Sequence, residues 1–74
     1  MNDFVFVIKT NDGMGMRYLS GVGDGWCGFE FQSWKAMHFE TFDEAVEKCD
    51  LFRDQYCDGT GVRAWVDTMS RGDT

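Results

Sequence analysis

Apolar and polar positions alternate with a period of two at the start of the chain, which predicts a β-strand over residues 3–10. One face of this strand carries Phe4, Phe6 and Ile8, and the other carries Val5, Val7 and Lys9. Both faces are therefore apolar until Lys9, and we expect the strand to lie in the centre of its sheet.

The same alternation predicts three further strands, over residues 15–20, 26–32 and 62–66. Asp12-Gly13, between the first two strands, is a typical hairpin turn, because glycine adopts the positive φ that such turns need. Residues 21–25 contain three glycines, and this composition predicts a flexible loop.

A helix is predicted to follow residues 33–39, a segment that we expect to be irregular or a short edge strand. Thr41-Phe42-Asp43-Glu44 is a capping box, in which Thr41 and Glu44 each satisfy the other residue's backbone N–H. Apolar residues then recur at steps of three and four, and they form one face: Phe42, Ala45, Val46, Cys49, Phe52 and Tyr56. Gly59 is expected to end the helix.

The order of these elements is β-β-β-α-β. Short connections between the strands favour an α+β fold, with a small antiparallel sheet of three to four strands and one helix packed on a face. We expect a single domain over residues 1–66 and a mobile C-terminal tail over residues 67–74, where no period is visible.

Length and composition narrow the class of protein. A chain of 74 residues holds one domain at most, and its twelve aromatic residues argue against disorder, because they give too much apolar surface to leave solvated. No apolar run approaches the roughly 18 residues of a membrane span, and no secretory signal is recognisable, so we expect a soluble protein of the host cytoplasm. Cys27, Cys49 and Cys57 are an odd number and favour free thiols. Their spacing matches no zinc pattern, and we expect no metal and no cofactor.

Charge indicates the kind of partner. Seven Lys and Arg stand against thirteen Asp and Glu, which gives a formal net charge of −6. Nucleic acids and anionic membranes should repel such a chain, whereas basic protein surfaces should attract it. A solubilising role for the charge is the alternative.

The carboxylates are concentrated on the predicted helix. At 100° per residue, six of them form one stripe beside or opposite the apolar face: Asp43, Glu44, Glu47, Asp50, Asp54 and Asp58. The stripe is about 22 Å long at 1.5 Å per residue. Like charges four residues apart destabilise a helix by a few tenths of a kcal/mol per pair, so the stripe is not explained by helix stability. We expect it to bind a basic partner, and the alternative is a solvated acidic face.

Two apolar residues complete the predicted partner-binding set. Leu51 falls within the acidic arc, where an exposed leucine would suit an interface with a charged rim. Trp34 lies in the irregular segment before the helix, and exposed tryptophan is enriched in interfaces.

Two other functions remain open. The small core and the aromatic excess are also typical of an oligomeric accessory or structural module, such as a homodimer. A small-molecule binder that uses the loop Gly21–Gly28 with Cys27 and His38 is the third possibility. One histidine without a placed nucleophile gives catalysis little support, and we do not expect an enzyme.

The arrangement resembles short phage and prophage proteins of β-β-α-β type. The resemblance lies in five segments: Val7-Ile8-Lys9-Thr10, Tyr18-Leu19-Ser20-Gly21, Gly25-Trp26, Ala36-Met37-His38-Phe39 and Thr41-Phe42-Asp43-Glu44-Ala45. Such small acidic proteins are similar to the inhibitors that phages use against host nucleases, including anti-CRISPR proteins and DNA mimics. The resemblance implies a protein that binds and blocks a basic, nucleic-acid-handling host protein or nuclease complex without binding nucleic acid itself.

Overall fold

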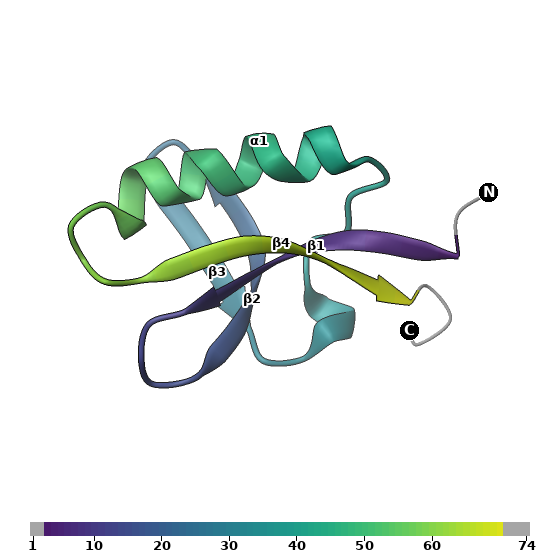
Figure 1. The fold of residues 1–74 in the computed structure, drawn as a ribbon, viewed down its shortest axis with the longest axis horizontal. Coiled ribbons are helices and arrows are strands. Elements are labelled where there is room, and N and C mark those ends of the chain that lie inside the picture. Colours follow the sequence, from purple (N-terminus) through teal and green to yellow (C-terminus); the bar gives the residue numbers. More distant parts are fainter. Residues whose placement is uncertain (1–2, 71–74) are drawn as a thin grey trace.

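A computed structural model describes residues 3–70, which form a four-stranded antiparallel sheet with one long helix packed on a face (Figure 1). The sheet order is β3-β2-β1-β4. The strands are β1 (Phe4–Asn11), β2 (Met16–Gly23), β3 (Trp26–Glu30) and β4 (Arg63–Ser70). The helices are η1 (Ser33–Lys35), α1 (Phe42–Phe52) and η2 (Arg53–Cys57). The predicted α+β fold class is confirmed.

β1 lies in the centre of the sheet, as its two apolar faces predicted. It pairs with β4 along its whole length, from Phe4 opposite Ser70 to Asn11 opposite Arg63. Its pairing with β2 is restricted to the three residues from Lys9 to Asn11. The two strands therefore diverge, and β1 does not pair with β2 over residues Phe4 to Ile8.

The segment before α1 fills this fork between β1 and β2. Phe6 and Phe39 exchange two backbone hydrogen bonds of 2.9 Å, and the N–H of Met37 donates to the carbonyl of Leu19 at 3.0 Å. Only η1, a single 3₁₀ turn, is regular in this segment, which agrees with the predicted irregular structure. The chain thus crosses from one side of the sheet to the other before α1 begins (Figure 1).

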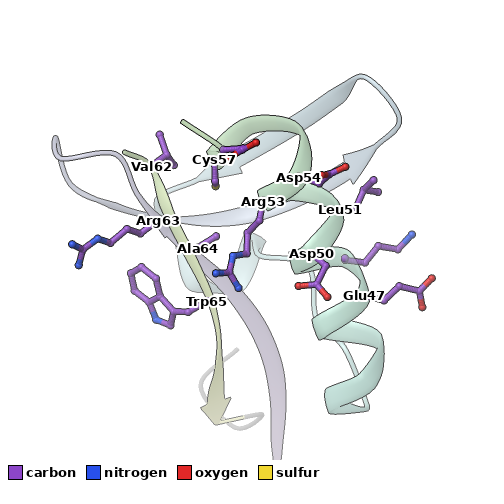
Figure 2. A pocket seen from close by; sticks show the side chains of 12 residues that line it. Glu47, Asp50, Leu51, Arg53, Asp54, Cys57, Val62, Arg63, Ala64 and Trp65 are labelled. Atoms are coloured by element: carbon purple, nitrogen blue, oxygen red, sulfur yellow. The ribbon is translucent and has the colours of Figure 1, made fainter. Parts of the chain in front are cut away.

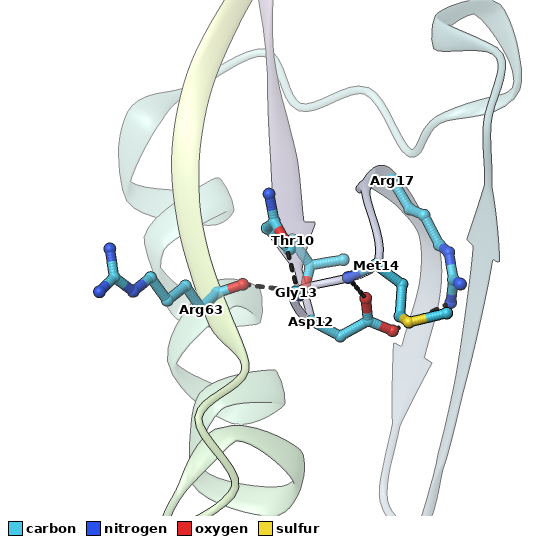
Figure 3. A network of polar contacts seen from close by, with 7 residues as sticks. Thr10, Asp12, Gly13, Met14, Arg17 and Arg63 are labelled. Atoms are coloured by element: carbon cyan, nitrogen blue, oxygen red, sulfur yellow. Dashed lines mark hydrogen bonds and ion pairs between the residues drawn. The ribbon is translucent and has the colours of Figure 1, made fainter.

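The turn between β1 and β2 is held by its own side chains (Figure 3). Asn11 Oδ1 accepts from the N–H of Gly13 at 2.8 Å, and Asp12 Oδ1 accepts from the N–H of Met14 at 2.9 Å. Gly13 has a φ of 94°, the positive value expected for this turn. Arg17 approaches Asp12 from β2, with 3.6 Å between Nη1 and Oδ2.

The prediction of a flexible loop over residues 21–25 is wrong. Gly21 and Gly23 belong to β2, and only Asp24 and Gly25 form the turn to β3. The indole ring of Trp26 lies against the Cα positions of both strand glycines. The glycines are therefore required for close packing of a large ring on the strand, whereas the composition alone indicated flexibility.

The long helix begins where the capping box predicted, but it does not remain α-helical to Asp58. The N–H of Glu44 donates to Thr41 Oγ1 at 3.2 Å. After Phe52 the chain widens into the π-helical turn η2, which has more residues per turn than an α-helix. Gln55 on this turn donates to the carbonyl of Gly23 at 2.9 Å and accepts from the N–H of Gly25 at 2.7 Å, so η2 is tied to the β2–β3 turn.

The main core lies between α1 and the sheet. Its buried members are Ile8, Leu19, Val22, Phe39, Ala45, Cys49, Phe52 and Ala64. Phe52 packs edge-on against Phe29 and stacks on Tyr56, with ring centroids 5.7 and 5.5 Å apart. Val5 and Val7 are buried on the other face of β1, which is the face on the side of η1.

β4 extends four residues beyond the predicted strand. From the sequence we expect the domain to end at Val66 and a mobile tail to begin at Asp67, whereas in the structure Asp67–Ser70 pair with β1. The ladder continues because β1 is long enough to supply partners as far as Phe4. The last four residues of the predicted tail lie outside the described residues.

Candidate functional site

All six carboxylates of the predicted stripe are exposed, and we call this set the acidic face: Asp43, Glu44, Glu47, Asp50, Asp54 and Asp58. They extend from the first turn of α1 to the residue that follows η2. Within residues 3–70, none of the six forms an ion pair with a lysine or arginine; the two ion pairs of that region are Lys9–Asp67 and Arg17–Asp12. All six carboxylates are therefore solvent-exposed and lack an ion-pair partner in that region.

The basic residues of the same segment do not interrupt the acidic face. Lys48 is half-buried, and Arg53 is exposed at the start of η2. Figure 2 shows the Arg53 side chain directed toward Ala64 and Trp65 of β4, whereas Glu47 is directed away from β4. Arg53 thus marks the boundary between the acidic face and the sheet edge.

The π-helical turn changes the end of the acidic face. The angular positions predicted at 100° per residue apply only through Phe52, because η2 advances by a smaller angle per residue. Asp58 no longer belongs to the helix and has an extended conformation, with a φ of −65° and a ψ of 119°. The regular, α-helical part of the acidic face therefore runs from Asp43 to Asp50, and Asp54 and Asp58 follow on η2 and directly after it.

Leu51 was predicted to be exposed among the carboxylates, and this prediction is wrong. Its side chain is half-buried and packs against the main core. Conversely, Phe42, which was predicted to lie on the core face, is 54% exposed. The buried side of α1 is centred on Ala45 and Phe52, so the apolar face is rotated away from Phe42 and toward Leu51.

Trp34 is exposed, as predicted, but it is not part of the acidic face. It lies on η1 with 59% of its surface exposed, and Lys35 Nζ is 5.0 Å from its ring centroid. Figure 1 shows η1 on the opposite side of the sheet from α1. A partner that covers α1 would therefore not reach Trp34 at the same time.

No local pattern of the sequence predicted the groove that lies between α1 and β4. This groove has a volume of about 1060 Å³ and is lined by both helix and strand residues, among them Asp50, Arg53, Arg63, Ala64 and Trp65 (Figure 2). It exists because β4 is an edge strand, so nothing in residues 3–70 continues the sheet beneath this side of the helix.

A smaller apolar cavity of about 230 Å³ lies between the β1–β2 hairpin and the end of α1. Its lining includes Cys27, Phe29 and Phe52 but not His38, whose Nε2 lies 3.4 Å from the carbonyl oxygen of Ser33. The structure thus does not join the two residues of the predicted small-molecule site in one cavity. Gly21–Gly28, the predicted binding loop, consists mostly of paired strand residues.

The three cysteines are free thiols in the structure. Burial raises the pKa of Cys49, and burial also raises the pKa of Cys57. Residues 3–70 contain no group of three or more His, Cys, Asp or Glu side chains placed to hold a metal ion. The same residues include no helix of the length and apolarity that crossing a membrane requires.

Comparisons with protein-family models, with curated proteins and with solved structures gave no match to this chain.

Proposed function

We propose that this protein is a non-catalytic inhibitor of phage or mobile-element type, which binds the basic, nucleic-acid-handling surface of a host protein or nuclease complex through its acidic face. The observation that carries the proposal is the exposure of six carboxylates along α1, η2 and the residue that follows, none of which has an ion-pair partner within residues 3–70. The resemblance to small acidic phage proteins supports the same kind of partner.

The spacing of the charges suits a surface that normally binds nucleic acid. Five carboxylates lie between Asp43 and Asp54, a length of about 16 Å at 1.5 Å per residue. This corresponds to one negative charge per roughly 4 Å, and one strand of duplex DNA carries one phosphate per about 3.4 Å. A row of Lys and Arg that fits a phosphate backbone would therefore meet a similar density of charge on α1.

The energetics of the helix also favour a partner. Asp43 with Glu47, and Asp50 with Asp54, are like-charge pairs four residues apart, and each costs a few tenths of a kcal/mol in the isolated protein. A basic partner converts these repulsive pairs into attractive contacts. Because the charges are exposed, they also accelerate association over a distance of about one Debye length, and the rate should fall with added salt.

The structure narrows the residues that such an interface would use. Leu51 contributes to the core and Trp34 lies across the sheet, so the proposed interface consists of the carboxylates alone. This surface is polar, and its affinity should depend strongly on ionic strength.

The experiment is an affinity capture from bacterial lysate with two variants that carry the same net charge. In one variant Asp50 and Asp54 are replaced by Lys, and in the control Asp3 and Asp24, which are also exposed but lie outside the acidic face, are replaced by Lys. We expect the wild type and the control to capture the same nucleic-acid-binding protein, and duplex DNA to displace it. The helix variant, and a variant with Lys at 43, 47, 50 and 54, should capture none.

Two results would contradict the proposal. One is capture of the same partner by the helix variants and the wild type at equal yield. The other is a captured partner that duplex DNA does not displace, because a phosphate mimic must compete with DNA. Circular dichroism of each variant verifies that α1 is retained.

A further inference from the structure

The two edges of the sheet differ in how well they are protected from pairing with another strand. β3 has five residues, and its pairing with β2 is interrupted by a register shift between Leu19 and Gly21. β4 has eight residues, contains no proline and pairs with β1 without a shift. Proteins usually protect a long edge strand with a bulge, a proline or charged side chains; β4 has neither bulge nor proline, and its two charged residues, Arg63 and Asp67, are of opposite sign and so do not repel a second copy of the strand.

The hydrogen bonds of Phe6 show which backbone groups of β4 face outward. The N–H and C=O of Phe6 bond to Phe39, so they point away from β4. The backbone N–H and C=O groups alternate in direction from one residue to the next along a strand. The backbone groups of Lys9 therefore point toward β4, and those of its partner Trp65 point toward β1. The N–H and C=O groups of Ala64 and Val66 therefore point out from the edge.

The outward N–H groups on either side of this pair are already bonded within the chain. The N–H of Thr68 donates to the carboxylate of Asp67 at 2.8 Å. On the other side, the N–H of Val62 donates to Thr60 Oγ1 at 3.2 Å. The open part of the edge is thus short and is centred on Trp65.

We propose that β4 pairs antiparallel with β4 of a second copy of this chain, with Trp65 opposite Trp65 of the partner subunit. In this register Ala64 lies opposite Val66 of the partner subunit, and the two pairs related by symmetry exchange four backbone hydrogen bonds. These bonds use the outward N–H groups that have no partner within residues 3–70. Trp65, which is 39% exposed, meets its equivalent at a position where side chains approach closely.

Charge selects this register from its neighbours. Arg63 lies opposite Asp67 of the partner subunit only when the two Trp65 residues face each other. Sliding one strand by two residues places Arg63 opposite the partner's Met69 or opposite the partner's Trp65, and the charge pair is lost. Within residues 3–70 the Arg63 side chain forms no ion pair, so it is available for this contact.

The side of the edge that faces α1 also has room for a second strand. The groove between α1 and β4 is open there and is lined by the small side chain of Ala64, with Val62 beside it. A dyad perpendicular to the sheet gives a continuous eight-stranded sheet with both helices on one face. The inference does not depend on the proposed function, but it would place two acidic faces on the same side of the dimer.

Sedimentation velocity with two charge-reversed variants, R63D and D67R, tests the proposal. In a homodimer of either variant, residues of like charge face each other at both contacts between position 63 and position 67. We therefore expect the dissociation constant of the dimer to rise about tenfold or more. An equimolar mixture of the two restores both opposite-charge pairs in the heterodimer. We therefore expect the mixture to dimerise like the wild type.

A second measurement does not depend on the stability of D67R, which also loses its contact with Lys9. In a W65C variant the two introduced thiols face each other at a position without cross-strand hydrogen bonds, and mild oxidation should link them through residue 65. The matched control, R63C, should give little such linkage, because its partner position is 67. A wild-type monomer at 200 µM, or a dimer that forms equally well in all variants and shows no 65–65 linkage, would overturn the proposal.

Discussion

Lys9 Nζ lies 2.8 Å from Asp67 Oδ2 and joins β1 to β4 on the sheet face opposite α1. The two residues are diagonal neighbours, since Lys9 pairs with Trp65 and Asp67 pairs with Val7. The contact fixes the end of β4 that the sequence analysis assigned to a tail. Asp67 lies on the edge strand, where its carboxylate also accepts a hydrogen bond from the N–H of Thr68.

The Lys9–Asp67 contact makes stability depend on pH at both extremes. The hydrogen bond from Lys9 lowers the pKa of Asp67, so this contribution is complete above about pH 4 and is lost as the pH falls through the lowered value. The bond to Asp67 raises the pKa of Lys9, so this contribution is complete below about pH 10 and is lost above it. The pair is partly exposed, and we expect K9M to cost at most about 1 kcal/mol at pH 7.

Urea unfolding of the wild type and K9M at pH 7 and pH 2.5 tests this prediction. The difference between the two proteins should be present at pH 7 and smaller at pH 2.5. A difference that is equal at both pH values would mean that Lys9 acts through the packing of its aliphatic chain, since protonation of Asp67 would then have no effect.

The N-terminus of α1 depends on the hydroxyl of Thr41, which accepts from the N–H of Glu44. We expect T41A to lower the free energy of unfolding by about 1 kcal/mol, because one N–H at the helix terminus loses its partner. T41S keeps the acceptor and should retain most of the stability. Equal losses in both variants would argue against capping and for a role of the Thr41 methyl group.

Close packing of Trp26 on β2 predicts an unusual sensitivity at Gly23. A methyl group at this position would overlap the indole ring of Trp26, and at Gly21 it would come within 2.9 Å of the same ring. We expect G23A to cost about 1–3 kcal/mol and to shift the tryptophan emission. In a W26A background the same substitution should cost little, and an unchanged cost there would show that another contact is responsible.

Phe52 is the largest fully buried side chain of the core, with only 1% of its surface exposed. We expect F52A to lower stability by about 3–5 kcal/mol, which is comparable to the whole stability of a domain of this size. F52A should therefore lack a cooperative thermal transition, whereas F52L should fold with a lowered Tm. A cooperative transition in F52A within a few degrees of the wild type would contradict this role.

The cysteines should differ in reactivity according to burial. Burial raises the pKa of Cys49, so its thiolate fraction at pH 8 is low, and only 3% of the residue is exposed. We expect iodoacetamide to modify Cys49 far more slowly than Cys27 in the folded protein, as peptide mass spectrometry can measure. In urea the three cysteines should react at similar rates. Rapid native labelling of Cys49 would indicate frequent opening of the helix.

The sequence by itself determined the elements that depend on local chemistry. The period of two around Phe6 predicted a central strand, Asp12-Gly13 predicted its turn, and Thr41 with Glu44 predicted the start of the helix. The exposure of the acidic face also followed from helical spacing through Phe52. These features are encoded within a few residues of one another, so a linear pattern is sufficient to find them.

Only the tertiary structure decided the features that depend on distant partners. Gly21 and Gly23 became strand residues because Trp26 packs on them, and Asp67 joined β4 because β1 offered a partner and Lys9 a charge. The rotation that packs the half-buried Leu51 against the core and exposes Phe42 depends on how α1 lies on the sheet. The open edge of β4 depends on strand order, and strand order is set by long-range contacts that no local period of the sequence records.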